Sequence, residues 1–402
     1  MINLETPRKF RAFVNQAHQV AAEMLRPNSR RYDLAEHEYP VELDMLAAMV
    51  DGLGASGTGS GAGASGVRRT ADAGGGVVNG SNLSSVLSIM EMCWGDVGLL
   101  LSMPRQGLGN SAIASVASEQ QLRRFDGVWA AMAITEPECG SDSASIRTTA
   151  RLDGDFYVLD GEKIFVTAGG RCDAVVVWAT LDKSLGRAAI KSFVVMKDTP
   201  GLTVERLEQK LGIRASDTAT IRLENCRVPR ENLLGSPDID ADKGFAGVMQ
   251  TFDNTRPLVA SMAVGCARAS LELTKELLAD AGVEVDYDRP VHRQPAAAAS
   301  YLAMEADWEA AYLLTLQAAW MADNRQPNSL QASMAKAKAG RTANDITLRC
   351  IELTSTLGYS EHELLEKWAR DSKILDIFEG TQQIQQLIVA RRLLGRTSAE
   401  LK

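Results

Sequence analysis

The residue pattern changes in the middle of this chain, and that change limits the folds open to it. Between about residues 128 and 228, β-branched and aromatic runs such as Phe156–Leu159 and Ala174–Trp178 are separated by turn residues such as Asp160–Gly161. Short runs bounded by turns are typical of strands. The residues on both sides have apolar positions at helical spacing instead. We therefore expect a small antiparallel β-domain between two helical domains, in a chain that is mainly α.

The flanking stretches predict helices of different lengths. Before the strands, helical spacing covers residues 8–50, 84–103 and 111–125. After them it covers residues 258–281, 296–323, 330–357 and 382–395. Four helices of that length favour an up-and-down four-helix bundle. A chain of 402 residues is long for a single core, so we expect three domains, over residues 1–130, 131–240 and 241–402.

A glycine-rich segment at residues 52–81 interrupts the first helical domain. It contains two G-x-G-x-x-G strings, which could be mistaken for a dinucleotide-binding fingerprint. That fingerprint needs a strand before it and a helix directly after it, whereas residues 43–50 read as helix and more glycine follows. We interpret the segment as a surface loop with no nucleotide site. The alternative is that it forms a flexible wall of a binding pocket and so admits a bulky ligand.

Composition excludes several classes of function. A net charge of -8 argues against a nucleic-acid or membrane-surface role, since either needs a basic face. The six cysteines form no C-x-x-C pair and there are only four histidines, so neither a zinc site nor a disulfide framework is expected. No apolar leader begins the sequence and no long apolar run follows, so we expect a cytoplasmic protein with no membrane span.

Glu379 is the first candidate catalytic residue. It lies in Ile377–Gln385, between an apolar stretch and a helical one, and is followed by Gly380 and Thr381. Glycine lets the backbone turn a side chain inward, and threonine offers a hydroxyl to a ligand. The pattern predicts a carboxylate held on a turn between two helices.

A second motif occurs at Ile134–Asp142, which reads I-T-E-P-E-C-G-S-D. Together with I-F-E-G-T-Q-Q-I-Q at Ile377–Gln385, it resembles the acyl-CoA dehydrogenase family of flavoproteins. The likeness continues through Gly161–Gly170, similar to the family's flavin-stacking strand, and through Lys210–Ser216. Phe252–Pro257 looks like the loop that opens the family's C-terminal helices. The resemblance implies helical, β and helical domains in that order, FAD as cofactor and an acyl-CoA substrate.

The resemblance also implies roles for single residues. Glu379 matches the base that removes the α-proton, with a raised pKa expected from burial. Some branches of the family place that base at the position matched by Thr255, which cannot serve. The cofactor-binding matches are Thr135 and Thr167 at the flavin ring, Phe165 beside its face, Met132 where many relatives have Tyr, Ser141 near the pyrophosphate, and Thr381 and Gln383 at the adenosine. The substrate-binding matches are Ser141, Asp253, Arg256 and Gly380.

The sequence departs from the family at two segments that relatives use to hold the FAD of a neighbouring subunit. Counted back from Glu379, these fall on Glu284–Asp288 and Glu352–Gly358, where acids and hydroxyl residues replace the usual arginine, glutamine and glycines. A carboxylate beside a pyrophosphate is repulsive. We therefore expect a tetramer, and our hypothesis is an α2β2 heteromer in which a second dehydrogenase-like subunit completes the flavin site.

Three readings remain open from sequence. The first is an acyl-CoA dehydrogenase that passes electrons to an electron-transfer flavoprotein. The second is an acyl-CoA oxidase or flavin monooxygenase on the same fold. The third is a flavin-free structural subunit, although such a subunit has no physical need for Glu379, Thr135, Ser141 and Thr167.

Overall fold

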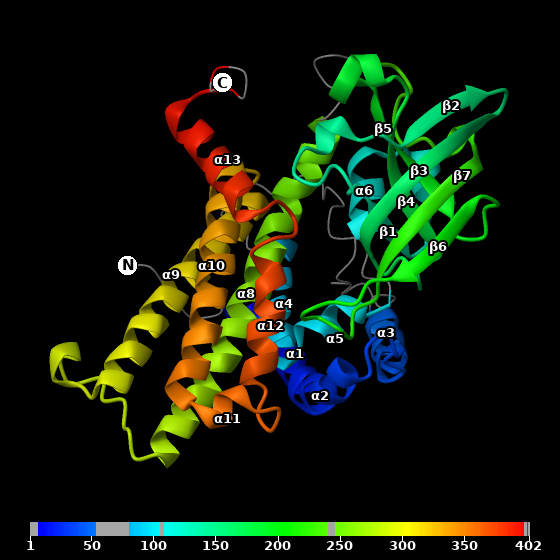
Figure 1. Cartoon of the computed structure of the whole chain (residues 1–402). Coiled ribbons are helices and arrows are strands. Elements are labelled where there is room, and N and C mark those ends of the chain that lie inside the picture. Colours follow the sequence, from blue (N-terminus) through cyan, green and yellow to red (C-terminus); the bar gives the residue numbers. More distant parts are fainter. Residues whose placement is uncertain (1–6, 54–79, 105–107, 240–245, 398–399, 401–402) are drawn as a thin grey trace.

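The computed structural model describes residues 7–53, 80–104, 108–239, 246–397 and 400, and gives no side chains for 49–53 and 246–254. The glycine-rich segment predicted at 52–81 thus lies almost wholly outside the described residues. Figure 1 shows the β-domain on one side of an elongated helical body, with the N-terminal helices packed beside both. Within the described ranges, no helix combines the length and apolar character needed to cross a membrane.

The N-terminal part is helical, as the periodicity predicts. Its helices begin with α1 (Arg8–Val20), which continues through the π-helical η1 (Ala21–Leu25) into α2 (Arg26–Leu34). The others are α3 (Glu42–Leu53), α4 (Ser81–Gly95), α5 (Val97–Ser102), α6 (Leu108–Val116) and α7 (Glu119–Arg124). Asp96 separates α4 from α5 and caps α5, because its carboxylate accepts a hydrogen bond from the Leu99 amide.

The middle of the chain forms one seven-stranded sheet in the order β1-β4-β2-β3-β7-β6, with β5 paired to β4. Its strands are β1 (Ala130–Ala133), β2 (Thr149–Asp153), β3 (Phe156–Thr167), β4 (Ala174–Thr180), β5 (Ile190–Met196), β6 (Leu202–Leu207) and β7 (Thr218–Pro229). One detail of the prediction was wrong: the sheet is mixed, since β1 lies parallel to β4. Residue patterns identify strands but not the direction in which distant strands pair.

The C-terminal part is a helical bundle. Its helices are α8 (Ala246–Asp280), α9 (Ala296–Asp323), α10 (Ser329–Thr354), the one-turn α11 (Thr356–Tyr359), α12 (Leu365–Leu375) and α13 (Gln382–Leu394). The expected loop at Phe252–Pro257 is instead part of α8, which includes Pro257. The loop was expected from the resemblance to the family, and proline is unusual inside a helix. Here the helix continues through it with one backbone hydrogen bond fewer.

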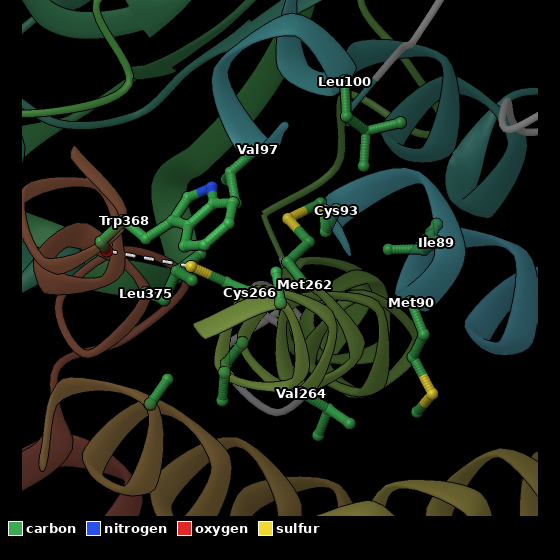
Figure 2. Close-up of a cluster of buried hydrophobic side chains, with 14 of the residues drawn as sticks. Ile89, Met90, Cys93, Val97, Leu100, Met262, Val264, Cys266, Trp368 and Leu375 are labelled. Carbon is green, nitrogen blue, oxygen red and sulfur yellow. Dashed lines mark hydrogen bonds between the residues drawn. The ribbon is translucent and has the colours of Figure 1, made fainter. Parts of the chain in front are cut away.

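Helix α8 is central to the main core (Figure 2). Met262, Val264 and Cys266 on α8 lie among side chains of α4, α5 and α12. The Cys266 thiol donates to the Trp368 carbonyl of α12 at 3.7 Å, and Trp368 is 1% exposed. This core joins the N-terminal helices to the bundle, so α12 is fixed by packing along its length.

A buried ionic cluster also fixes α12. Lys367 Nζ lies 2.6 Å from Asp96 Oδ2 and 2.5 Å from Asp371 Oδ2, and Ser29 donates to the same Asp96 oxygen. Burial alone would lower the pKa of Lys367, but the carboxylates of Asp371 and Asp96 outweigh burial and raise it. The other Asp371 oxygen accepts the Ile213 amide of the β-domain. Three parts of the chain therefore meet at one lysine.

Gly212 brings the β-domain into backbone contact with α12. A Cβ at this position would lie 2.4 Å from the carbonyl carbon and oxygen of Arg370. Arg370 Nη1 in turn donates to the Leu211 carbonyl at 3.0 Å. The Lys210–Ser216 segment is thus the joint between the sheet and the helix that precedes Glu379.

Gly212→Ala should loosen this joint. The added methyl meets backbone, which cannot rotate away, so we expect a loss of about 1–3 kcal/mol of stability and a clear fall in the melting temperature. Gly140→Ala is the matched control, because its Cβ would meet only Thr135 Cγ2, at 3.8 Å. Equal melting temperatures for the two variants would contradict the close contact.

Candidate active site

The turn between α12 and α13 holds Glu379 in an unusual backbone conformation. Glu379 has φ 57° and Gly380 has φ 92°. A positive φ costs conformational energy for most residues other than glycine, so the backbone of Glu379 is strained. A Cβ on Gly380 would also lie 2.5 Å from Gln385 Nε2. Thr381 then starts α13 by capping it, since its hydroxyl accepts a hydrogen bond from the Ile384 amide. The prediction of a carboxylate on a turn between two helices is confirmed.

The carboxylate of Glu379 contacts helix α8 of the bundle. Thr255 Oγ1 on α8 donates to Glu379 Oε2 at 2.7 Å. Burial raises the pKa of Glu379, while this hydrogen bond and the positive charges of Arg256 and Lys336 act against the rise. The net direction is upward, toward the range in which a carboxylate can both accept and release a proton near neutral pH.

Arg256 lies beneath this turn. Its side chain is 3% exposed, and Nη1 lies 3.5 Å from Ser333 Oγ on α10. It is therefore not an exposed ion-pair residue, and its charge acts on Glu379 from within the bundle. The side chain of Asp253, the other residue assigned to this region from sequence, is outside the described part of the structure.

The second group of candidate residues lies on the β-domain. The Thr135 carbonyl accepts the Ile164 amide at 2.9 Å, so the segment after β1 runs beside the end of β3 that carries Phe165 and Thr167. Phe165 has φ 58° and is 60% exposed. A large exposed aromatic side chain on a strained backbone, with Thr167 two residues away and Thr135 on the adjacent segment, fits a planar ring such as a flavin. Met132 is on β1, and its side chain is partly buried.

A buried ion pair holds the Thr135 segment in place. Lys163 Nζ lies 2.7 Å from Glu136 Oε1 and donates to the Ile134 carbonyl at 3.0 Å. Thr148 donates to the same Glu136 oxygen through its amide at 2.9 Å and its hydroxyl at 2.6 Å. Although burial acts to raise the pKa of Glu136, Lys163 and these hydrogen bonds outweigh it and lower that pKa. Glu136 therefore organises the motif and remains ionised.

The remaining candidates lie at the surface or at helix ends. Ser141 is exposed in the turn after Cys139, and Gln383 is exposed in the first turn of α13. Thr381 is partly buried because its side chain caps α13. The structure thus gathers the predicted residues into two groups, one on the β-domain and one around the turn of Glu379.

Comparison with known proteins identifies the family. Family models described as the acyl-CoA dehydrogenase middle domain and C-terminal domain match residues 131–226 and 242–394. The short-chain specific acyl-CoA dehydrogenase of Clostridium acetobutylicum is 31% identical over 326 residues, which cover 79% of this chain and 84% of that protein. The chain belongs to the acyl-CoA dehydrogenase family. Its resemblance to that family, noted from the motifs, is confirmed.

Two further relatives show how far the likeness extends. The mitochondrial short-chain specific acyl-CoA dehydrogenase of Bos taurus is 39% identical over 262 residues, but these span only 62% of that protein and 65% of this chain. The structure of butyryl-CoA dehydrogenase from Megasphaera elsdenii superposes with a TM-score of 0.82 at 28% identity, covering 98% of this chain and all of the other. The likeness of fold therefore extends through all three parts of the chain that the structure describes, and is not confined to the 262 residues shared with the Bos taurus protein.

In this member of the family, the two segments expected to have lost the FAD clamp lie at one end of the bundle (Figure 1). Residues 284–288 follow α8, and residues 352–358 span the break between α10 and α11. Ser355 at that break has φ 51°, a conformation in which a side chain is strained. Tyr287 is 57% exposed and Tyr359 80% exposed, so large side chains face outward here.

Sequence reasoning missed two residues that contact the turn of Glu379. Lys336 Nζ donates to the Gly380 carbonyl at 2.7 Å. Gln385 Nε2 donates to the carbonyls of Glu379 at 2.9 Å and of Gly380 at 3.1 Å. The available signal was a lysine between Ala332 and Ala339 on one helical face, an apolar place where a charge needs a partner.

Proposed function

We propose that this chain is an FAD-dependent acyl-CoA dehydrogenase that forms a trans-2-enoyl-CoA. The observation that carries the proposal is the carboxylate of Glu379, held on a strained turn, hydrogen-bonded to Thr255 and set above the buried charges of Arg256 and Lys336. A base in that setting can take a proton from a weakly acidic carbon. Family membership supports the same reaction class.

In the proposed reaction, Glu379 takes the α-proton of the acyl thioester and a C=C bond forms between the α and β carbons. FAD, when bound, accepts the hydride that leaves the β-carbon. Thr135 and Thr167 would hold the edge of the flavin ring, Phe165 would cover its face, and Met132 would lie beside it. Ser141 would bind near its pyrophosphate, with Thr381 and Gln383 at its adenosine end.

The substrate side of the proposal rests on fewer residues. Gly380 has no side chain to block an approaching thioester, and Asp253 and Ser141 are proposed on the path of the CoA arm. Arg256, assigned to the substrate from sequence, is buried and would act on the reaction through its charge near Glu379. Two of the relatives described above are named as short-chain specific enzymes. A first substrate series should therefore begin with butyryl-CoA and lengthen the chain stepwise.

The oligomeric state is proposed from the altered clamp. Exposed Leu357 and Tyr359 at the end of the bundle (48% and 80% exposed) offer apolar contact area, while Glu284 and Glu352 would repel a pyrophosphate. We propose a tetramer of α2β2 type in the cytoplasm, whose second subunit completes the flavin site, with an electron-transfer flavoprotein as electron acceptor. The domain limits at residues 130 and 240 stay predictions.

A visible absorption spectrum tests the cofactor and the assembly together. The chain is purified alone and after co-expression with a candidate partner subunit. We expect oxidised-flavin bands only in the complex, and bleaching when acyl-CoA is added without oxygen. Flavin bound by the chain alone would contradict the proposed heteromer but would remain consistent with the proposed dehydrogenase activity. No flavin in either sample would favour a structural subunit.

The route of reoxidation separates the dehydrogenase from an oxidase on the same fold. We expect the bleached protein to recover slowly in air and quickly with an electron-transfer flavoprotein. Rapid recovery in air with release of hydrogen peroxide would show that the oxidase reading is right. Glu379 would serve as base in either enzyme, so this experiment does not depend on its role.

A further inference from the structure

Lys336 is a buried charge beside the candidate base. It lies on α10 with no exposed surface (0%), between the buried residues Ala332 and Ala339 on the same helical face. A buried ammonium group needs compensation, because removing it from water is costly. Burial lowers the pKa of Lys336 to about 8, although Asp376 and Glu379 act to raise it and Arg256 acts to lower it further. The fold therefore keeps a costly group at this place.

The contact that Lys336 makes is with the backbone of the turn. Its Nζ donates to the Gly380 carbonyl at 2.7 Å. Gln385, which is also fully buried at 0% exposure, donates to that carbonyl and to the Glu379 carbonyl. Two buried side chains from α10 and α13 thus hold the carbonyls of the two residues that have positive φ. Without them, both carbonyls would lose their partners in a strained turn.

The charges around Glu379 come from several elements. Arg256 comes from α8 and Lys336 from α10, and both favour the ionised carboxylate. Asp376, at the end of α12, disfavours loss of the proton from Lys336, and it also pairs with Arg341 of α10 at 3.5 Å. Lys336 contacts the turn itself, because its ammonium group donates a hydrogen bond to the Gly380 carbonyl.

We propose that Lys336 is a positioning residue for Glu379, which fixes the left-handed turn of the base through the Gly380 carbonyl and places a positive charge beside that turn. The proposal rests on the proposed role of Glu379 as base, and it adds a residue that touches neither substrate nor cofactor. A positive charge stabilises the ionised form of a carboxylate. Removing it should therefore move the acid limb of the pH profile to higher pH.

The test uses Lys336→Met and Lys336→Gln in the flavin-loaded protein. Met removes both the charge and the hydrogen bond, whereas Gln removes the charge but can still donate to the Gly380 carbonyl. We expect the apparent pKa of the acid limb of the kcat/KM profile to increase by about one pH unit in both variants. We expect kcat to fall by about 10- to 100-fold in Lys336→Met, because the base is displaced, and by less in Lys336→Gln.

Two control variants separate charge from geometry. Lys338→Met removes a lysine of the same helix whose Nζ pairs with Asp307 at the surface, 2.6 Å away, and should leave both kcat and the acid limb unchanged. Gln385→Leu removes hydrogen bonds from the same turn without removing a charge, and should lower kcat without moving the limb. A shift of the limb in Gln385→Leu equal to that in Lys336→Met would overturn the role of charge.

A readout without turnover keeps this inference separate from the proposed reaction. The infrared band of the protonated Glu379 carboxyl group, assigned by its loss in Glu379→Gln, can be titrated in the folded protein. We expect Lys336→Gln to raise the pKa obtained from this band. The proposal is wrong if both Lys336 variants fold, keep the parent's pKa values for the infrared band and for the acid limb, and keep kcat within about twofold of the parent. Full activity in Glu379→Gln would instead overturn the proposed base, whatever the band shows.

Discussion

Glu379→Gln should lower kcat for acyl-CoA oxidation by about 10²- to 10⁴-fold, the range that a general base typically contributes. The amide has nearly the same shape and can still accept the hydrogen bond that Thr255 gives to the carboxylate, but it cannot take a proton. Substrate binding should be almost unchanged. The measurement is the rate of flavin bleaching after anaerobic mixing, together with the dissociation constant of the acyl-CoA.

The control for this loss is the same exchange at an exposed carboxylate. Glu119 on α7 has a side chain that is 89% exposed, and Glu119→Gln should keep kcat within about twofold, since isolated surface charges contribute little. If Glu379→Gln retained more than a tenth of the parent rate, the base would have to be another group. The dehydrogenase proposal would then lose its main support.

Lys367→Met should cause the largest loss of stability. It leaves Asp96 and Asp371, both fully buried at 0% side-chain exposure, without their shared cation. Removing one partner of a buried ion pair costs about 3–5 kcal/mol, because the other charge stays buried and unpaired. We expect a large fall in the melting temperature, measured by circular dichroism and by flavin release.

Lys338→Met serves as control for this change as well. Its ion pair with Asp307 is partly exposed, with side-chain exposures of 33% and 64%, so its loss should cost no more than about 1 kcal/mol. Similar melting temperatures for Lys367→Met and Lys338→Met would show that the buried cluster does not join the domains. Adding Asp371→Leu to Lys367→Met should recover part of the loss, since one unpaired charge is then removed.

Local patterns in the sequence predicted the elements but not how they meet. The helix predicted at residues 296–323 is α9 (Ala296–Asp323), because alanine-rich helical spacing and Pro295 mark it locally. The start of α8 was missed because Phe252–Pro257 was assigned, by resemblance, to a loop, whereas α8 includes Pro257. The ion pair of Lys367 with Asp96 joins residues 271 positions apart. No local pattern signals that pair.

The same limit applies to the candidate site. Glu379 and Gly380 were found because a carboxylate before glycine and threonine is unusual between two helices. Lys336 was missed because a lysine on a helix is normally exposed, and only the folded bundle shows that its side chain ends at the Gly380 carbonyl. The raised pKa expected for Glu379 agrees in direction with the structure. The charges of Arg256 and Lys336, which act to lower the pKa of Glu379, could not be predicted because only the folded bundle brings them near it.

The joint at Gly212 has a consequence for how such an enzyme can change its substrate. Helix α12 contacts the β-domain at Asp371 and Arg370, and only a few residues later its chain reaches Glu379. The position of Glu379 relative to the β-domain is therefore set by the last turn of α12, which rises by about 1.5 Å per residue, and by the short turn that follows Leu375. For the reaction proposed above, we expect a longer or branched acyl group to be accommodated by exchanging side chains around Glu379, because moving its turn away from the β-domain would break the backbone contact at Gly212.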